Sequence, residues 1–285
     1  MSKLKIAVQK SGRLHDDSMK ILKEVGISID NGKDQLKASA RNFPLEVFYL
    51  RNGDIPQYLR DGVVDAAIIG ENILFEKGKD IKIVERLGFS KCRVSIAVPK
   101  NSNSESLKSL NGKRIATSYP NTVNAFLDAY GIEANLHIIN GSVEIAPNIG
   151  LADAVCDIVS SGSTLFKNGL KEVEVLLKSE AVLATSPLIS DENQELINRL
   201  QFRLRSVLRG RENKYVLLNA PNEKLEAITQ ILPGMNSPTI LPLAKEGWSS
   251  LHSVINKNDF WNVIDELKAN GAEGILVCPI ENMVL

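Results

Sequence analysis

The chain has 285 residues, and its 34 basic and 34 acidic side chains give a formal net charge of zero at pH 7. This balance argues against binding to nucleic acid or to an anionic membrane surface, because both usually require a basic excess. A hydrophobic fraction of 44% and a charged fraction of 24% are typical of a soluble globular protein, and the length suggests two or three domains.

The three cysteines, Cys92, Cys156 and Cys278, lie far apart in the sequence and form no Cys-x-x-Cys pair. We therefore predict neither disulfides nor a zinc site, as in a reducing compartment. The N-terminal sequence MSKLKIAVQKSGRL lacks the apolar segment of a secretory signal, and no apolar run approaches the ~20 residues that span a bilayer. We expect a cytoplasmic protein.

The first hundred residues alternate between strand and helix patterns. Strands are predicted at 5–9, 45–50, 65–70 and 93–99, and helices at 14–25 and 55–61. Gly26 and Gly62 follow the two helices, as C-terminal glycines commonly do. This alternation predicts an α/β fold with a largely parallel sheet.

The same pattern restarts after residue 99. Strands are predicted at 114–118, 135–139, 154–159, 173–177 and 181–185, and helices at 123–130 and 191–209. Each half also contains an acid five residues before a glycine, Asp65 before Gly70 and Asp157 before Gly162. Two such halves predict two similar lobes with a ligand-binding cleft between them.

A smaller domain is predicted beyond the charged segment 210–214. Its elements are a strand at 215–219, a helix at 222–232, strands at 239–243 and 249–255, a helix at 259–269 and a strand at 274–278. This βαββαβ order over about 70 residues is that of the ferredoxin-like motif.

A turn rich in hydroxyl groups follows the strand at 154–159. Residues 160–164 read SSGST and precede a short helical segment, so their amides and hydroxyls suit a phosphate. Asp157, in the strand before the turn, could accept hydrogen bonds from a sugar diol, so the combination fits a phosphorylated ribose. The alternative is an ordinary serine-rich turn with Thr164 as the N-cap.

Other polar residues lie near predicted strand ends. Lys10, Gly12 and Arg13 follow the first strand and suit nucleotide phosphates, although a solvated loop explains them equally well. Gly70 and Glu71 close another strand and could line the same cleft.

Two further residues allow two interpretations each. Tyr119 could stack on a base, whereas an aromatic residue before proline usually packs in the core. Glu144 lies on a predicted helix, where an acid commonly complements the helix dipole. The sequence contains neither a Walker A motif nor a GxSxG elbow, so a P-loop kinase and a serine hydrolase are disfavoured.

The segments AVQKSGRL, GVVDAAIIGEN, LNGKRIATSYP and NGSVEIAP, together with the spaced pattern from Glu144 to Leu165, closely resemble the ATP phosphoribosyltransferase family. This family catalyses the first step of histidine biosynthesis. The segments PTILPLA and GAEGILVCPIE are similar to the long form, which carries a regulatory domain. The resemblance covers essentially the whole chain.

The resemblance implies a two-lobed catalytic part like the type II periplasmic binding proteins, followed by the ferredoxin-like domain. By this similarity, residues 1–98 plus 180–210 form lobe I, 99–179 form lobe II, and 211–285 form the regulatory domain.

The resemblance also implies three sets of binding residues. The set for phosphoribosyl pyrophosphate is Glu144, Asp157, Ser160, Ser161, Gly162, Ser163 and Thr164. The set for ATP or AMP is Lys10, Gly12, Arg13, Asp65, Gly70, Glu71 and Tyr119. The set for regulatory histidine is Asn219, Thr239 and Gly274, although some relatives carry an acid where this chain has Asn219.

The implied reaction moves the 5-phosphoribosyl group from phosphoribosyl pyrophosphate to N1 of ATP, with Mg²⁺ as cofactor. AMP is an implied competing ligand, histidine a feedback inhibitor, and the assembly a dimer–hexamer equilibrium. Because adenine N1 already carries a lone pair, we assign no residue as a general acid or base. No protein ligand of the metal is assigned either.

Two alternatives come from other classes. A non-enzymatic two-lobed anion-binding protein or regulator would share this architecture. A phosphoribosyltransferase for another base, such as orotate or adenine, usually has two adjacent acids before the turn, whereas here only Asp157 precedes it.

Overall fold

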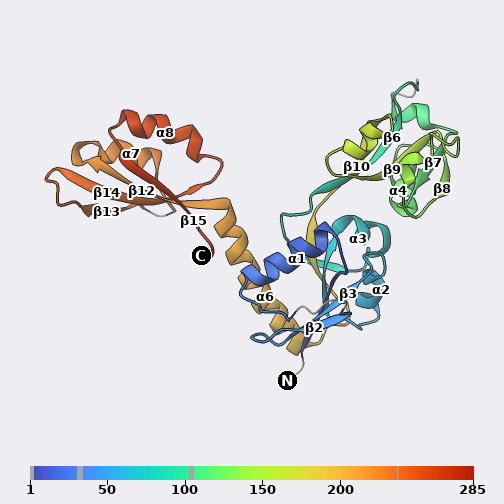
Figure 1. Ribbon diagram of the computed structural model, residues 1–285, viewed down its shortest axis with the longest axis horizontal. Helices are drawn as coiled ribbons and strands as arrows, with labels where there is room; N and C mark the ends of the chain where they lie inside the picture. Colours follow the sequence, from blue (N-terminus) through green and yellow to red (C-terminus); the bar gives the residue numbers. More distant parts are fainter. Residues whose placement is uncertain (1–2, 31–34, 103–105, 236) are drawn as a thin grey trace. The chain divides into compact units, whose positions relative to one another are not determined.

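The computed structural model describes residues 3–30, 35–102, 106–235 and 237–285 (Figure 1). The chain divides into two compact units, Met1–Gln201 and Phe202–Leu285, and the division falls within helix α6 (Asp191–Glu212). The domain boundaries predicted from the sequence stay predictions. Within the described residues, no helix combines the length and the apolar character needed to cross a bilayer.

The first lobe is built on a six-stranded sheet with the order β2-β3-β1-β4-β11-β5. The strands are β1 (Leu4–Gln9), β2 (Lys37–Ser39), β3 (Leu45–Leu50), β4 (Ala66–Gly70), β5 (Lys82–Arg86) and β11 (Ala181–Thr185). The helices are α1 (Arg13–Glu24), α2 (Ile55–Arg60) and α3 (Glu71–Lys77). Strands β1, β3 and β4 are parallel, and the apolar runs of β1 and β4 are buried, as expected where both faces are covered.

The second lobe is built on a five-stranded sheet with the order β10-β6-β9-β7-β8. The strands are β6 (Cys92–Pro99), β7 (Arg114–Thr117), β8 (Asn135–Ile138), β9 (Ala154–Val159) and β10 (Leu170–Ser179). The helices are α4 (Pro120–Ala129) and α5 (Ser163–Lys167), with 3₁₀ turns η1 (Leu107–Leu110) and η2 (Val143–Ile145).

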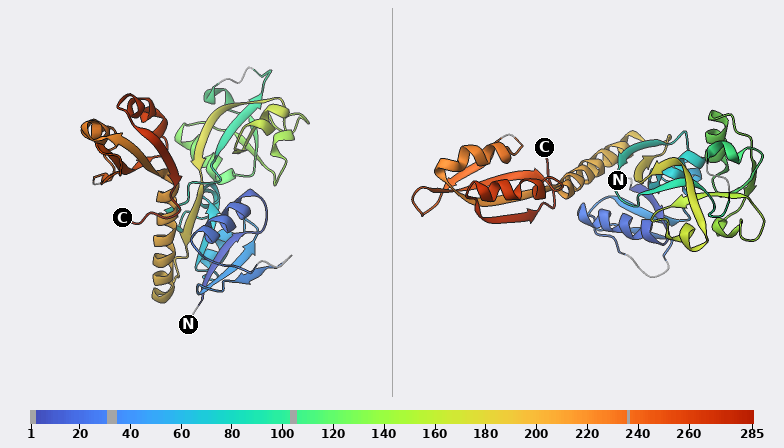
Figure 2. Two further views of the ribbon diagram at one scale, coloured as in Figure 1. Left: turned by 60° about the vertical axis from the view of Figure 1, so that its left-hand side comes forward. Right: turned by 90° about the horizontal axis from the view of Figure 1, so that it is seen from above.

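Apart from the edge strand β2, the two sheets share one strand order, which confirms the prediction of two similar lobes. Figure 2 shows the chain from two further sides. In each sheet one strand, β4 or β9, pairs antiparallel with a strand that arrives from the other lobe, β11 or β6. This exchange is the arrangement of type II periplasmic binding proteins. Strand β6 thus pairs into the second sheet, although the predicted boundary at residue 98 assigns it to the first lobe.

The second unit confirms the predicted βαββαβ order and the ferredoxin-like fold. Its elements are β12 (Asn213–Pro221), η3 (Asn222–Lys224), α7 (Leu225–Ile231), β13 (Thr239–Pro242), β14 (Trp248–Asn256), α8 (Phe260–Ala269) and β15 (Glu273–Pro279). The antiparallel sheet has the order β13-β14-β12-β15. A core that includes Val216, Leu251 and Leu267 is buried between this sheet and the two helices. Tyr215 and Leu276 are exposed on the same sheet.

An ion pair holds the beginning of β9 to the beginning of β7. The guanidinium of Arg114 donates to the Asp153 carboxylate at 2.9 and 3.2 Å, and the Arg114 amide donates to it at 3.0 Å. Arg114 also donates to the Gly150 carbonyl oxygen at 3.0 Å. The guanidinium lowers the pKa of Asp153 from 3.8 to about 2.

We predict that Arg114→Met lowers the melting temperature more at pH 7, where Asp153 is ionised, than at pH 2, where only the bond to Gly150 is lost. A carboxyl whose pKa is lower in the folded state stabilises the fold above its unfolded pKa of 3.8, and the effect disappears as the pH falls toward 2. The loss is modest because both side chains are more than one-third exposed and solvent screens the pair. Thermal unfolding between pH 7 and pH 2 tests this, and an equal deficit at both ends would contradict it.

Candidate active site

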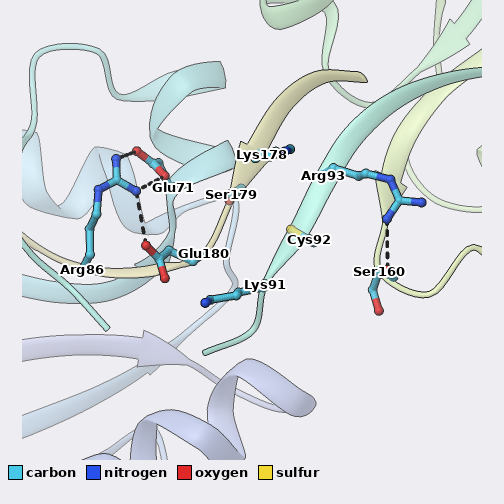
Figure 3. Close-up of a pocket in the computed structure, with 9 residues that line it drawn as sticks. All are labelled: Glu71, Arg86, Lys91, Cys92, Arg93, Ser160, Lys178, Ser179 and Glu180. Carbon is cyan, nitrogen blue, oxygen red and sulfur yellow. Dashed lines mark hydrogen bonds and ion pairs between the residues drawn. The ribbon is translucent and has the colours of Figure 1, made fainter. Parts of the chain in front are cut away.

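A cavity of about 410 Å³ lies where the chain crosses between the lobes (Figure 3). Cys92, at the start of β6, pairs with Ser179, at the end of β10, so the two crossing segments run side by side. The lining residues are Glu71, Arg86, Lys91, Cys92, Arg93, Ser160, Lys178, Ser179 and Glu180. Four of these are basic and two are acidic, which suits an anionic ligand.

The first lobe contributes a buried acid and an exposed cation to the wall of the cavity. Glu71 begins α3 and is 4% exposed, and its two oxygens both accept hydrogen bonds from Arg86, one of them at 2.7 Å. Arg86 also approaches Glu180 at 3.5 Å (Figure 3). A bidentate arginine satisfies a buried carboxylate that would otherwise be costly, so Glu71 holds Arg86 at the cavity wall.

On the second lobe, Arg93 anchors the hydroxyl-rich turn. Its guanidinium binds the Glu172 carboxylate at 2.8 and 2.9 Å and donates to the Ser160 carbonyl oxygen at 3.2 Å. Ser160 follows β9 directly, so Arg93 fixes the point at which the turn begins. Figure 3 shows Arg93 and Ser160 joined at one side of the cavity.

The turn itself has the predicted strand–turn–helix form. Gly162 has φ +80° and is the N-cap of α5, so the alternative in which Thr164 caps the helix is wrong. The hydroxyls of Ser161 and Ser163 lie 3.0 Å apart. All four hydroxyl-bearing residues of the turn, Ser160, Ser161, Ser163 and Thr164, are exposed. The turn therefore presents hydroxyl groups to solvent rather than using them in packing.

A buried polar network lies behind the cavity and joins the lobes. The backbone amide of Asn72 donates to Ser179 Oγ at 2.9 Å, and Ser179 Oγ donates to the side-chain oxygen Oδ1 of Asn72 at 3.0 Å. Asn72 Nδ2 donates to the Tyr119 hydroxyl at 3.0 Å. Tyr119 is 6% exposed within the apolar core, and burial followed by the charge of Asp157 raises its pKa. The packing interpretation of Tyr119 accounts for this position, and its predicted role at ATP stays a prediction.

Two carboxylates lie near the turn. Asp157 is part of β9 and accepts a hydrogen bond from the Ile158 amide at 2.8 Å. Burial, and to a lesser degree the negative charge of Glu144, raise its pKa. Glu144 lies in the 3₁₀ turn η2 and not in the α-helix that the sequence predicts, because Ser142 before it adopts the left-handed conformation with φ +50°. Hydrogen bonds from a ligand diol would offset the desolvation of Asp157.

The other first-lobe candidates gather at the carboxyl edge of the sheet. Lys10, Gly12 and Arg13 are exposed after β1, and Gly12 has φ +88° at the N-cap of α1. Gly70 ends the neighbouring strand β4, and a Cβ there would overlap Asn72 Oδ1, so a larger residue would displace the Asn72 side chain. The four residues lie beyond parallel strand ends, where ligands bind in open α/β sheets.

Asp65 is the exception, and its position contradicts the predicted assignment to a nucleotide site. It precedes β4 at the opposite edge of the sheet, where its carboxylate accepts a hydrogen bond from the Lys5 amide at 2.7 Å. Five residues of strand place Gly70 roughly 16 Å away. The Asp-to-Gly spacing is misleading because β4 continues to Gly70, whereas β9 ends at Val159, before Gly162.

The sequence did not single out several lining residues, namely Arg86, Lys91, Lys178, Ser179 and Glu180. The segments SKCR and LKSE carry charged residues where the chain passes from one lobe to the other. Their charges indicate a shared site only once β6 and β10 are known to be neighbours. Antiparallel pairing of strands about 80 residues apart is a tertiary fact that periodicity does not contain.

The predicted regulatory residues all lie on the sheet of the second unit. The side chain of Asn219 is next to Gly274, where a Cβ would lie 3.4 Å from Asn219 Nδ2. Thr239 is exposed on the edge strand β13 opposite His252, so β14 separates it from Asn219. His252 in turn has Nδ1 2.7 Å from the Tyr215 hydroxyl.

Comparison with known proteins gives consistent matches. The family model HisG, described as ATP phosphoribosyltransferase, matches residues 51–206, and the model of the HisG C-terminal domain matches residues 210–282. An ATP phosphoribosyltransferase of Cytophaga hutchinsonii is 54% identical over 281 residues, covering 99% of this chain and 98% of the relative. One from Bacteroides thetaiotaomicron is 53% identical over 282 residues, covering 99% of this chain and 100% of the relative.

A solved structure is also similar. It is the ATP phosphoribosyl transferase (HisG:HisZ) complex from Thermotoga maritima, with a TM-score of 0.63 and 27% identity. The match covers 72% of this chain and 98% of the solved chain.

Proposed function

The chain belongs to the ATP phosphoribosyltransferase family, and from this premise we propose that it transfers the 5-phosphoribosyl group of phosphoribosyl pyrophosphate to N1 of ATP. The products are N1-(5-phosphoribosyl)-ATP and pyrophosphate. Membership identifies a pentosyl-transferring enzyme of the first step of histidine biosynthesis. The detailed reaction and its feedback inhibition by histidine are part of the proposal.

One observation carries the assignment of the donor site. A partly buried acid, Asp157, lies near the end of β9, three residues before an exposed turn that begins at Ser160 and has four hydroxyl-bearing residues. Asp157 accepts the ribose hydroxyls, and residues 160–164 hold the 5-phosphate through hydroxyls and amides. Arg93 keeps the turn in place through Ser160. Glu144 completes this set from η2, and its charge already acts on Asp157.

The acceptor lies toward the first lobe. Lys10, Gly12 and Arg13 lie at the carboxyl edge of that sheet together with Gly70 and Glu71, and they hold the adenine nucleotide. AMP competes there because it shares the adenosine monophosphate portion of ATP. Adenine N1 attacks C1 of the ribose with its in-plane lone pair while the bond to pyrophosphate breaks.

The chemical demands are alignment of two anionic substrates and stabilisation of the leaving group. Alignment converts the attack into an effectively unimolecular step. Charge accumulates on the departing pyrophosphate, and the cavity presents Arg86, Lys91 and Lys178 to it. A protein base is not required, since N1 carries no proton at neutral pH.

The residues fit Mg²⁺ as a cofactor that accompanies the donor. Within the described residues, no group of three or more histidine, cysteine, aspartate or glutamate side chains could hold a metal ion by itself. Mg²⁺ usually binds through one or two carboxylates plus substrate phosphates and waters, and Asp157 and Glu144 provide two neighbouring carboxylates. When bound, the ion neutralises charge on the pyrophosphate.

The proposed reaction is tested by mixing the protein with ATP, phosphoribosyl pyrophosphate and Mg²⁺ and following the ultraviolet absorbance of N1-alkylated adenine. We expect product with ATP and none with orotate or adenine as the acceptor. Transfer to another base would replace the substrate assignment. Tight binding of the donor without turnover would favour the non-enzymatic anion-binding alternative.

We further propose that the second unit binds histidine through Asn219, Thr239 and Gly274, in a cytoplasmic enzyme that interconverts between dimer and hexamer. Support comes from the contact of Asn219 with Gly274 and from the position of Thr239 opposite His252. The exposed Tyr215 and Leu276 of the same sheet are suited to contact between subunits.

Thr239→Ala is expected to raise the half-inhibitory histidine concentration about 3- to 10-fold, the effect of one lost hydrogen bond, and to leave uninhibited turnover unchanged. Histidine titrations of steady-state rates measure it. Ser237→Ala removes an exposed hydroxyl near the same strand and serves as the matched control. Equal losses of turnover and inhibition in Thr239→Ala would instead identify a structural residue.

A further inference from the structure

Glu76 connects the two lobes through hydrogen bonds that the proposed chemistry does not use. It lies on α3 of the first lobe and is 4% exposed. One carboxylate oxygen accepts a hydrogen bond from the backbone amide of Asn121 at 2.9 Å. The other accepts from the backbone amide and the hydroxyl of Thr122, both at 2.8 Å. The peptide oxygen of Glu76 also accepts from Asn121 Nδ2 at 3.0 Å.

The acceptor groups are needed because α4 of the second lobe has no cap of its own. Tyr119 occupies the N-cap position, where its side chain makes no capping hydrogen bond, and Pro120 follows as the first helical residue. The amides of Asn121 and Thr122 therefore lack partners within the helix. A carboxylate satisfies them and complements the positive end of the helix dipole. The cap of α4 thus comes from the other lobe.

Apolar packing lies on one side of this cap, and on the other side Glu76 and Asn121 line a cavity together with the charged Arg60, Lys77, Lys79 and Asp80. Helices α3 and α4 are in contact, and one core cluster contains Ile73 and Leu74 of α3 together with Val123 and Leu127 of α4. Because the Glu76 side chain is buried, its charged hydrogen bonds are strong when made and costly when lost. The lobes are therefore fixed to each other at α3 and α4, and Glu76 is the charged group at that junction.

Both helices begin next to the proposed substrates. Helix α3 starts at Glu71, which lines the cavity, and α4 starts after Tyr119, whose pKa is affected by the charge of Asp157. A shift of α3 against α4 would therefore displace the nucleotide side of the site from the phosphoribosyl side.

We infer that Glu76 is a positioning residue that sets the alignment of the two lobes, and thereby the approach of adenine N1 to ribose C1. The inference rests on the proposed function, because only a reaction between substrates held by different lobes depends on this alignment. Glu76 touches neither substrate. Its loss changes the rate of the transfer step more than the affinity for either substrate alone.

The test is Glu76→Gln in the full-length enzyme, which keeps the size of the side chain but replaces one acceptor oxygen with an NH₂ group. We expect kcat to fall about 10- to 100-fold, as for a small misplacement of reacting groups. The Kd of phosphoribosyl pyrophosphate alone and of ATP alone, measured by calorimetry, are expected to stay within about 2-fold of the unmodified protein. Thr122→Val removes only the hydroxyl contact and is expected to cause a smaller decrease of kcat.

Glu192→Gln makes the same chemical change at an exposed position in the first turn of α6 and is the matched control, with kcat expected unchanged. A normal kcat in Glu76→Gln would overturn the inference while leaving the proposed function intact. Parallel losses of kcat, of both affinities and of the concentration of active sites would also overturn the inference, since these losses indicate unfolding. An unmodified enzyme that fails to form product would overturn the proposed function and this inference with it.

Discussion

Asp157→Asn is expected to lower kcat/KM for phosphoribosyl pyrophosphate about 100-fold while slightly stabilising the fold at neutral pH. Two hydrogen bonds from ribose hydroxyls to a carboxylate contribute about 3 kcal/mol together, which corresponds to that factor. Asparagine keeps the shape of the side chain and one acceptor oxygen, but its NH₂ group faces a hydroxyl and the negative charge is gone. Steady-state kinetics with the donor varied at saturating ATP measures the loss.

The direction of the stability change follows from the pKa of Asp157. Burial raises this pKa above its ordinary value, so in the window that begins at 3.8 the folded state binds more protons than the unfolded state. The stability of the unmodified protein therefore falls as the pH rises through the window, because the buried carboxylate ionises and its desolvation then costs free energy. Asparagine removes that cost, as expected for a residue that serves function at the expense of stability.

Asp153→Asn is a matched control because it makes the same substitution at the other end of β9. The pKa of Asp153 is lowered by Arg114, which is the opposite direction, so this variant is expected to be less stable at neutral pH and to bind phosphoribosyl pyrophosphate normally. The melting temperature and the KM for phosphoribosyl pyrophosphate are measured for both variants, and the two variants are expected to change opposite quantities. Destabilisation of Asp157→Asn with an unchanged donor KM would refute its assignment as a ligand of the ribose.

The strand β1 and the helix α1 could be predicted from the sequence because local periodicity determines both, and the bounds agree within one residue. Strand β5 was missed, since it is the edge strand of its sheet and its residues, KIVER, are only partly buried and do not alternate. In the candidate site, the turn at 160–164 is a local feature and was found. Glu76 was not, because its role depends on amides 45 and 46 residues away on another lobe.

The same distinction explains the error at Asp65. An acid lies five residues before a glycine in both lobes, but the two strands end at different points. Because β4 extends to Gly70, Asp65 and Gly70 lie at opposite ends of that strand. Asp157 has the same spacing to Gly162, but it lies near the end of β9, close to the turn. The spacing therefore correctly indicated that β4 and β9 occupy the same place in the two sheets. It wrongly indicated that Asp65 and Asp157 occupy the same place in their strands.

Arg93→Met is expected to raise the KM for phosphoribosyl pyrophosphate about 10-fold and to lower the free energy of unfolding by about 1–3 kcal/mol, the range for lost charged hydrogen bonds. The Arg93 side chain is 32% exposed and its partner Glu172 25% exposed, so solvent screens the pair only in part. Methionine keeps the apolar portion of the side chain but frees both Glu172 and the carbonyl of Ser160. The turn that holds the 5-phosphate then loses its link to β6, and ordering it on binding costs more.

Arg114→Met is the matched control. The Arg114 guanidinium also binds a carboxylate through two nitrogens and donates to a backbone carbonyl oxygen, but at the beginning of β9 instead of its end. Both variants lose an arginine anchor of the same strand, but only Arg93 is attached to the turn. We therefore expect a raised donor KM in Arg93→Met alone, with the KM for ATP unchanged in both. A donor KM raised equally by the two substitutions would mean that general loosening of β9, and not the hold on Ser160, controls donor binding.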